Sequence, residues 1–209
     1  MMLAHAVSGA VSLLAILSLA GTLGAQATGD TTRRTAPESE LPLIPTRALK
    51  FTTDEGTWMS LDLSPDGRTV VFDLLGDLYT IPVTGGAATR ITSGSGFDGQ
   101  PRFAPDGKSI VFVSDRSGSE NLWLVDPDGK RVRPLSRGNA QAFVSPDFTP
   151  DGQYVVTSKG GDLWLYHVGG GSGLRLTGVT PPATGGGPEG GAAPANFMGA
   201  SVSPDGRYI

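Results

Sequence analysis

The sequence predicts an all-β fold, an incomplete β-propeller of four-stranded antiparallel blades with three full blades and the start of a fourth. Three observations predict it. A five-residue turn sequence occurs four times, as SPDGR, APDGK, TPDGQ and SPDGR, at Pro65, Pro105, Pro150 and Pro204. The first three copies are followed by short apolar segments in the same order. The first two intervals between these prolines are 40 and 45 residues, and a period of about 40–45 residues is typical of a propeller blade.

The composition agrees with short strands and many turns. The 209 residues include 31 Gly and 16 Pro, and only 17% are charged, which is unfavourable for long helices. The net charge of -4 and the absence of any long run of Lys or Arg argue against a nucleic-acid-binding surface. No cysteine is present, which excludes disulfides, a thiol nucleophile and zinc–cysteine sites.

The amino-terminal segment predicts export. Residues 11–23 are apolar apart from Ser, Gly and Thr, and Ala25-Gln26-Ala27 fits a small-residue cleavage site. We therefore expect a signal peptide over residues 1–27, a periplasmic or extracellular location, and no membrane contact after cleavage. The alternative is an uncleaved membrane anchor, for which the apolar stretch is short. Residues 28–50 are polar and contain several prolines, which predicts a linker.

The first repeat unit spans about residues 51–95. Apolar Met59, Leu61 and Leu63 alternate with polar residues, which predicts a half-buried first strand. In the turn that follows, Pro65 presets its own φ and Gly67 accepts a left-handed conformation, so a tight hairpin is expected. Segments rich in β-branched and aromatic residues predict the other strands, at residues 69–72, 77–83 and 88–92.

The second and third units repeat this order, with blades predicted over about 96–138 and 139–178. The expected strands of the second lie at 101–103, 109–113, 121–125 and 133–136. Those of the third lie at 146–148, 154–157, 162–166 and 174–177. The longer third interval of 54 residues is attributed to a Gly/Pro-rich insertion over 178–195, which cannot bury a core and is expected to be a surface loop. The fourth blade then starts at residue 196.

Ser114-Asp115-Arg116-Ser117-Gly118, followed by the aromatic strand Asn121-Leu122-Trp123, carries a family resemblance. Together with the SPDG turns it resembles the WD-type repeats of TolB-like β-propellers, over Phe51–Ile209. The resemblance implies a propeller, and some propellers of this kind stand alone in complexes with envelope proteins, so the expected partner is either the chain's own further C-terminal region or an envelope protein.

A narrower resemblance concerns two stretches. Residues 55–60, EGTWMS, and the strands after them are similar to the N-terminal propeller of exported bacterial amidohydrolases, as are residues 163–170. This implies that a metal-dependent amidohydrolase domain, with a divalent metal, follows Ile209, and that the propeller controls substrate access or packs against that domain. A TolB-like periplasmic protein-interaction module and the gating propeller of a prolyl oligopeptidase-type serine peptidase are the alternatives.

We expect no catalytic, cofactor-binding or metal-binding residues within 1–209. A metal-dependent hydrolase needs several converging ligands, whereas the chain has only His5, in the predicted signal peptide, and His167, at a strand end. No G-x-S-x-G elbow is present. The G-x-G-x-x-G string at 94–99 precedes a predicted strand rather than a helix. The repeated turn carboxylates are expected to form turns, at Asp66, Asp106, Asp151 and Asp205.

Tyr79, Trp123 and Trp164 hold matching places on the third strands, and a recurrent position predicts packing between blades; the alternative is a binding face. A closed propeller has about 4–8 blades. Three blades and the start of a fourth would leave apolar faces and strand edges uncovered. We therefore expect the sequence to be a fragment of a longer protein whose own C-terminal region completes it.

Overall fold

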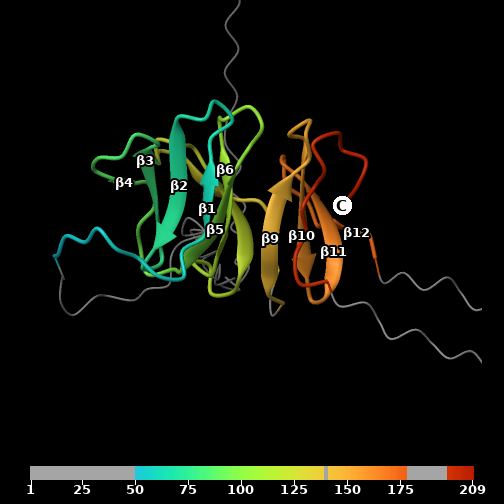
Figure 1. The fold of residues 1–209 in the computed structure, drawn as a ribbon. Coiled ribbons are helices and arrows are strands. Elements are labelled where there is room, and N and C mark those ends of the chain that lie inside the picture. Colours follow the sequence, from blue (N-terminus) through green and yellow to red (C-terminus); the bar gives the residue numbers. More distant parts are fainter. Residues whose placement is uncertain (1–49, 139–140, 178–196) are drawn as a thin grey trace, which may run out of the picture. The chain divides into compact units, whose positions relative to one another are not determined.

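The computed structural model describes residues 50–138, 141–177 and 197–209. These residues form twelve strands and no helix, arranged in three four-stranded antiparallel sheets (Figure 1). The predicted all-β fold of four-stranded antiparallel blades is therefore confirmed. The expected signal peptide at 1–27, the linker at 28–50 apart from Lys50, and the insertion at 178–195 lie outside the described residues.

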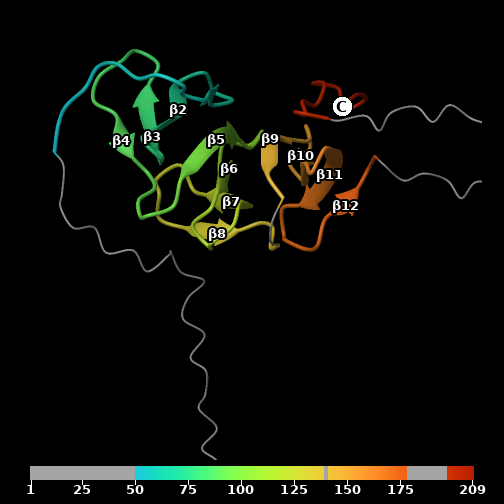
Figure 2. The same ribbon diagram turned by 90° about the horizontal axis from the view of Figure 1, so that it is seen from below.

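The three sheets correspond to the three repeat units and are called blades 1, 2 and 3. Blade 1 consists of β1 (Leu61–Leu63), β2 (Thr69–Leu74), β3 (Asp77–Pro82) and β4 (Thr89–Arg90). Blade 2 consists of β5 (Asp98–Phe103), β6 (Ile110–Ser114), β7 (Asn121–Val125) and β8 (Val132–Pro134). Blade 3 consists of β9 (Phe143–Phe148), β10 (Tyr154–Lys159), β11 (Asp162–His167) and β12 (Leu174–Arg175). Within each blade the strands follow one another in sequence order, and the first strands of successive blades are in contact (Figure 2).

Strands β5 and β9 begin three residues earlier than predicted. The predicted starts, Pro101 and Pro146, lie inside the strands, directly after a residue with positive φ, Gln100 at 55° and Ser145 at 49°. The pairing register shifts at the same places. Proline has no N–H to give to a strand ladder, so a β-bulge lets each strand continue past it.

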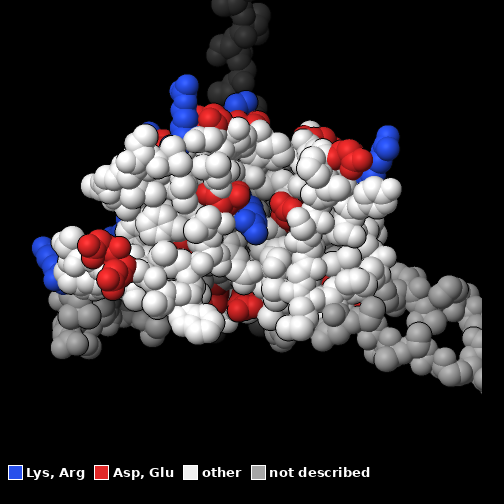
Figure 3. Space-filling model, viewed as in Figure 1, with Lys and Arg blue, Asp and Glu red and all other residues white. Residues whose placement is uncertain are grey.

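The turns between the first and second strands form as predicted. Gly67 has a φ of 71°, and its N–H donates to the Ser64 carbonyl at 2.8 Å. The other three copies have the same geometry, with φ of 68–70° at Gly107, Gly152 and Gly206. Figure 3 shows acidic and basic groups together along the upper edge, the end at which β2 begins in Figure 1.

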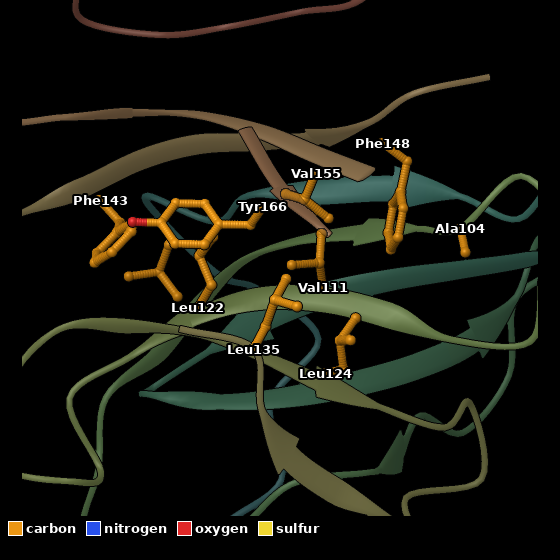
Figure 4. Close-up of a cluster of buried hydrophobic side chains, with 10 residues drawn as sticks. Ala104, Val111, Leu122, Leu124, Leu135, Phe143, Phe148, Val155 and Tyr166 are labelled. Atoms are coloured by element: carbon orange, nitrogen blue, oxygen red, sulfur yellow. The ribbon is translucent and has the colours of Figure 1, made fainter. Parts of the chain in front are cut away.

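The core lies between the blades. One cluster joins blades 1 and 2, through Val71, Leu78, Ile91, Phe103, Ile110, Phe112, Trp123 and Val125. A second cluster joins blades 2 and 3 (Figure 4), through Ala104, Val111, Val113, Leu122, Leu124, Leu135, Phe143, Phe148, Val155 and Tyr166. Both sides of blade 2 are therefore buried, because each cluster covers one of them.

The prediction that Met59, Leu61 and Leu63 form a half-buried row is wrong for the described residues. All three side chains are exposed. The alternation was identified correctly, but the residues in contact with blade 2 lie on the opposite side of blade 1, where Val71 and Leu78 are fully buried. Within the described part of the chain, no helix has the length and apolar character needed to span a membrane.

Candidate functional site

His167, the histidine weighed as a catalytic candidate in the sequence, is not part of a cluster of catalytic or metal-binding side chains among the described residues. His167 ends β11 and is exposed; its Nδ1 accepts a hydrogen bond from the Gly169 N–H at 3.0 Å. Its ring meets the Tyr154 ring edge-on, with centroids 5.2 Å apart. Among residues 50–138, 141–177 and 197–209, no three His, Cys, Asp or Glu side chains lie together as a metal site. His5 lies outside these ranges.

The turn carboxylates hold their own turns together. Asp66 accepts hydrogen bonds from the Ser64 hydroxyl at 2.6 Å and from the Arg68 N–H at 3.1 Å. The Ser64 hydroxyl bond is the main reason why the pKa of Asp66 lies below its ordinary value. Asp151 and Asp205 repeat the arrangement, with hydroxyl donors at 2.6 and 2.7 Å. In blade 2 the hydroxyl is replaced by Ala104, and Asp106 keeps the N–H bond from Lys108 at 2.9 Å.

Successive turns also touch one another. A Cβ added at Gly107 would lie 3.7 Å from Pro65 Cδ, and one at Gly152 would lie 3.6 Å from Pro105 Cδ. Gly206 approaches Pro150 in the same way, at 3.6 Å. Open hollows of about 280 and 440 Å³ separate neighbouring turns and are lined largely by these Pro, Asp and Gly residues. The turns therefore form a continuous row along one end of the described sheets.

Ser114 and Arg116 of the Ser-Asp-Arg-x-Gly motif take part in buried contacts within blade 2. Arg116 donates to Asp98 at 2.5 Å, and Asp98 also accepts from the Ser114 hydroxyl at 2.6 Å. The Arg116 guanidinium lies 5.3 Å from the ring centroids of Phe112 and of Trp123. Both members of this ion pair are buried. Asp98 and Arg116 therefore tie the start of β5 to the loop after β6, whereas Ser117 and Gly118 of the motif are exposed.

The aromatic residues of the third strands divide into two groups. Trp123 is buried in the cluster between blades 1 and 2, and Trp164 packs against the cluster between blades 2 and 3. Tyr79 stacks instead on Phe72, with centroids 5.7 Å apart, on the side of blade 1 that faces away from blade 2. Two of the three residues thus pack between described blades.

Lys159 is a residue that the sequence did not single out. Its Nζ lies 5.1 Å from the centroid of Phe143 and 4.9 Å from that of Trp164, and it donates to the Tyr166 hydroxyl at 3.3 Å. Burial lowers the pKa of Lys159 and raises the pKa of Tyr166 to about 12. The aromatic faces stabilise the charged ammonium. No local pattern signals this contact, because its partners come from different strands.

Hydrogen bonds also connect the first strands of neighbouring blades. Asp62 of β1 accepts from the Phe103 N–H of β5 at 2.8 Å. Asp147 of β9 accepts from the Val202 N–H at 2.9 Å. Both carboxylates stand two residues before the first residue of an x-P-D-G turn, which is the sequence signal that would have identified them. Arg102, at that position in blade 2, donates to the Leu61 carbonyl at 3.1 Å.

One broad apolar surface has no partner among the described residues. It is the side of blade 1 opposite blade 2, called here the open side of blade 1, where cross-strand pairs place Leu61, Leu63, Val70, Phe72, Tyr79 and Ile81. Leu61 and Leu63 are exposed, and the other four are half-buried. A continuous apolar face of this kind marks an interaction surface.

Comparisons with known proteins agree with this geometry. The family model of the TolB beta propeller domain matches residues 35–169. An uncharacterized protein of Agrobacterium fabrum (strain C58) is 34% identical over 97 residues, 44% of this chain and 33% of that protein. The Tol-Pal system protein TolB of Bordetella pertussis is 43% identical over 56 residues, 26% of this chain and 13% of that protein.

A solved structure of a putative TolB from Agrobacterium tumefaciens superposes with a TM-score of 0.54 at 26% identity, covering 59% of this chain and 50% of that one. The matched part of the chain thus spans a third or less of the two curated relatives. The repeat turns, the four-stranded blades and the family match lead to one conclusion: the chain belongs to the TolB beta-propeller family.

Proposed function

We propose that this propeller is a non-catalytic binding module of an exported, periplasmic or extracellular protein, and that it binds protein surfaces. The observation that carries the proposal is that the polar side chains described above form their hydrogen bonds and ion pairs with other parts of the propeller. The turn carboxylates, the Asp98–Arg116 pair and the carboxylates of Asp62 and Asp147 all bond within or between blades. The described surface also exposes large apolar side chains, among them Trp58, Leu61 and Leu63, which suit contact with a protein partner.

A relative of the chain is named for the Tol-Pal system, which supports envelope proteins as the class of partner. A second candidate function is that of the N-terminal propeller of an exported metal-dependent amidohydrolase, where it would control substrate access or pack against the catalytic domain. The resemblance of residues 55–60 favours it, and within that stretch the Trp58 side chain is 99% exposed. An aromatic side chain so fully exposed suits a contact with a further domain.

The test uses the complete gene product, purified from the periplasm. The binding proposal predicts that His167→Ala leaves any hydrolytic kcat unchanged, because the exposed His167 ring accepts a hydrogen bond from the Gly169 N–H of its own turn and contacts the Tyr154 ring. A loss of kcat in a variant that still folds would contradict a non-catalytic propeller. Amide hydrolysis that a chelator removes and added Zn²⁺ or Mn²⁺ restores would favour the amidohydrolase candidate. Co-purification of the gene product with a defined envelope protein, together with no hydrolytic activity, would favour the TolB-like interaction module.

A further inference from the structure

The outer strands of blades 1 and 3 share a charged pair. In blade 3, Trp164 of β11 lies opposite Arg175 of β12, and Arg175 forms an ion pair with Asp162, which begins β11, at 2.6 Å. Blade 1 has the equivalent pair between Arg90 and Asp77, at 3.3 Å. In both blades, therefore, a guanidinium bound to a carboxylate lies beside the aromatic residue of the third strand.

Blade 2 lacks both members of this pair. Asn121 begins β7 in place of an aspartate, and Pro134 lies opposite Trp123 in place of an arginine. These three residues line an open hollow of about 290 Å³, together with residues of the two adjacent loops. Proline has no side chain that could extend over Trp123, so the position that carries a guanidinium in the other two blades is open in blade 2.

The amide of Asn121 organises the wall of this hollow. Its Nδ2 donates to the Ser119 carbonyl at 3.2 Å and to the Gly138 carbonyl at 3.3 Å, and its Oδ1 accepts from the Ser136 hydroxyl at 3.1 Å. The Ser119 hydroxyl donates to the same Gly138 carbonyl at 2.8 Å. These bonds join the loop between β6 and β7 to the segment after β8, so the fold itself shapes the hollow.

The lining groups that could bind a ligand are mostly hydrogen-bond donors. The Trp123 residue is 3% exposed, and its buried indole N–H has no hydrogen-bond partner among the described residues. At the exposed rim, Arg137 carries a guanidinium and Ser117 a hydroxyl. No Asp or Glu is among the described residues that line the hollow. Because an indole and a guanidinium can only donate, a ligand for this hollow must bring acceptors.

The contrast with blade 3 shows which feature is particular to blade 2. The Trp164 indole N–H also lacks a partner among the described residues, so an unpartnered indole alone does not mark a site. Beside Trp164, however, lies the guanidinium of Arg175, which is itself a donor and is bound to Asp162. Blade 2 instead combines the unpartnered indole with an open hollow and with a cationic side chain at its rim.

We propose that the hollow beside Trp123 is a binding site for a small oxyanion, a carboxylate or a phosphate. The Arg137 guanidinium and the Ser117 hydroxyl hold the anion at the rim, and an oxygen at the base of the hollow gives the Trp123 N–H the acceptor that it lacks. Hydrogen bonds from a guanidinium to an oxyanion are shorter and stronger than bonds between neutral groups. The volume of the hollow lies at the lower end for ligand pockets and limits the ligand to a small molecule.

An NMR titration of the complete gene product, prepared with isotope-labelled tryptophan, tests the proposal. The Trp123 indole signal is the one that Trp123→Phe removes. Sodium acetate or inorganic phosphate, added at constant pH and ionic strength, should shift this signal saturably, because the indole proton gains an anionic acceptor. Arg137→Gln should weaken the affinity at least about tenfold through loss of a charge-assisted bond. Arg131→Gln, which removes an 81% exposed arginine from the same blade, is the matched control and should leave the affinity unchanged.

Saturable binding of either anion supports the proposal, and the anion that binds more tightly identifies the ligand as a carboxylate or a phosphate. The absence of a saturable shift with both anions would overturn it. Equal losses of affinity in the two arginine variants would also overturn it, because the anion would then respond only to net charge.

A double variant, Asn121→Asp with Pro134→Arg, gives blade 2 the charged pair of its neighbours and should abolish the shift; a shift that persists in this variant, once folded, would contradict the assigned site. Arg137→Gln changes only an exposed side chain, so it decides the proposal even where the double variant does not fold. Neither readout depends on hydrolytic activity or on a protein partner.

Discussion

The carboxylate of Asp62 in blade 1 accepts a hydrogen bond from the Phe103 N–H in blade 2, at 2.8 Å, across 41 residues of sequence. Asp147 makes the same bond to the Val202 N–H at 2.9 Å. A strand N–H that points away from its own sheet needs such an acceptor when it is partly buried. An aspartate at this position thus joins blade 1 to blade 2 and blade 3 to the fourth repeat, whereas Arg102 holds the matching position in blade 2.

The first prediction concerns this bond. Asp62→Ala removes the acceptor and leaves the part-buried Phe103 N–H without its partner, so we expect the free energy of unfolding to fall by about 1–2 kcal/mol. Urea unfolding of the purified chain measures the change. Asp54→Ala removes a carboxylate on an exposed bend and serves as the control. An equal effect of the two substitutions would mean that Asp62 does not join the blades.

The second prediction uses the turn of blade 2, where Ala104 stands in place of the Ser or Thr of the other copies. In the first turn the Ser64 hydroxyl donates to Asp66 and accepts from the Thr69 N–H at 2.9 Å. Ala104→Ser should create both bonds and raise the free energy of unfolding by about 0.5–1.5 kcal/mol. Ser64→Ala should lower it by a similar amount. Urea midpoints that move the same way in both variants would contradict this role.

The sequence was sufficient to predict features whose cause is local. The Gly67 turn and the bounds of β7 at Asn121–Val125 follow from turn chemistry and from a run of apolar residues. The β-bulge at Gln100 does not, because a contact distant in sequence supports it: the Gln100 N–H donates to Asp73, 27 residues away, at 3.0 Å. The strained φ of Gln100 is stable only once blade 1 lies beside blade 2.

The candidate site likewise contains features that the local sequence predicts and features that depend on contacts distant in sequence. The role of the turn carboxylates was predicted from the residues of the turn alone. The motif residue Arg116 was recognised by resemblance, but its pairing with Asp98, 18 residues earlier, depends on the strand register of blade 2. The open side of blade 1 was identified as an alternating row, yet its exposure depends on what lies next to it, which alternation does not encode.

The third prediction concerns acid. Hydrogen bonds from neighbouring hydroxyls lower the pKa of Asp66, Asp151 and Asp205 below the ordinary value of 3.8. A group with a depressed folded-state pKa stabilises the fold fully above the unfolded value, and this contribution is lost as the pH falls through the lower folded value. Urea midpoints should therefore decline below about pH 4.

The triple variant Asp66→Asn, Asp151→Asn and Asp205→Asn tests which groups are responsible. It should be less stable than the wild-type chain at pH 6 and should lose less stability between pH 6 and pH 3, because its turns no longer contain a titrating carboxylate. Asp54→Asn is the matched control, since that carboxyl lies on an exposed bend outside the turns. An unchanged acid dependence in the triple variant would place the responsible groups elsewhere.

The last prediction separates a buried ion pair from an exposed one. Arg116→Met leaves the Asp98 carboxylate buried without its cation, and removing one partner of a buried pair costs about 3–5 kcal/mol of unfolding free energy. Arg131 pairs with Asp126 at 2.7 Å, but its side chain is 81% exposed, so Arg131→Met should cost less than about 1 kcal/mol. Adding Asp98→Asn to Arg116→Met should restore part of the lost stability, because no buried charge then remains. Urea unfolding of the four chains gives the comparison, and similar losses for the two single Arg variants would show that Asp98 reaches water when Arg116 is absent.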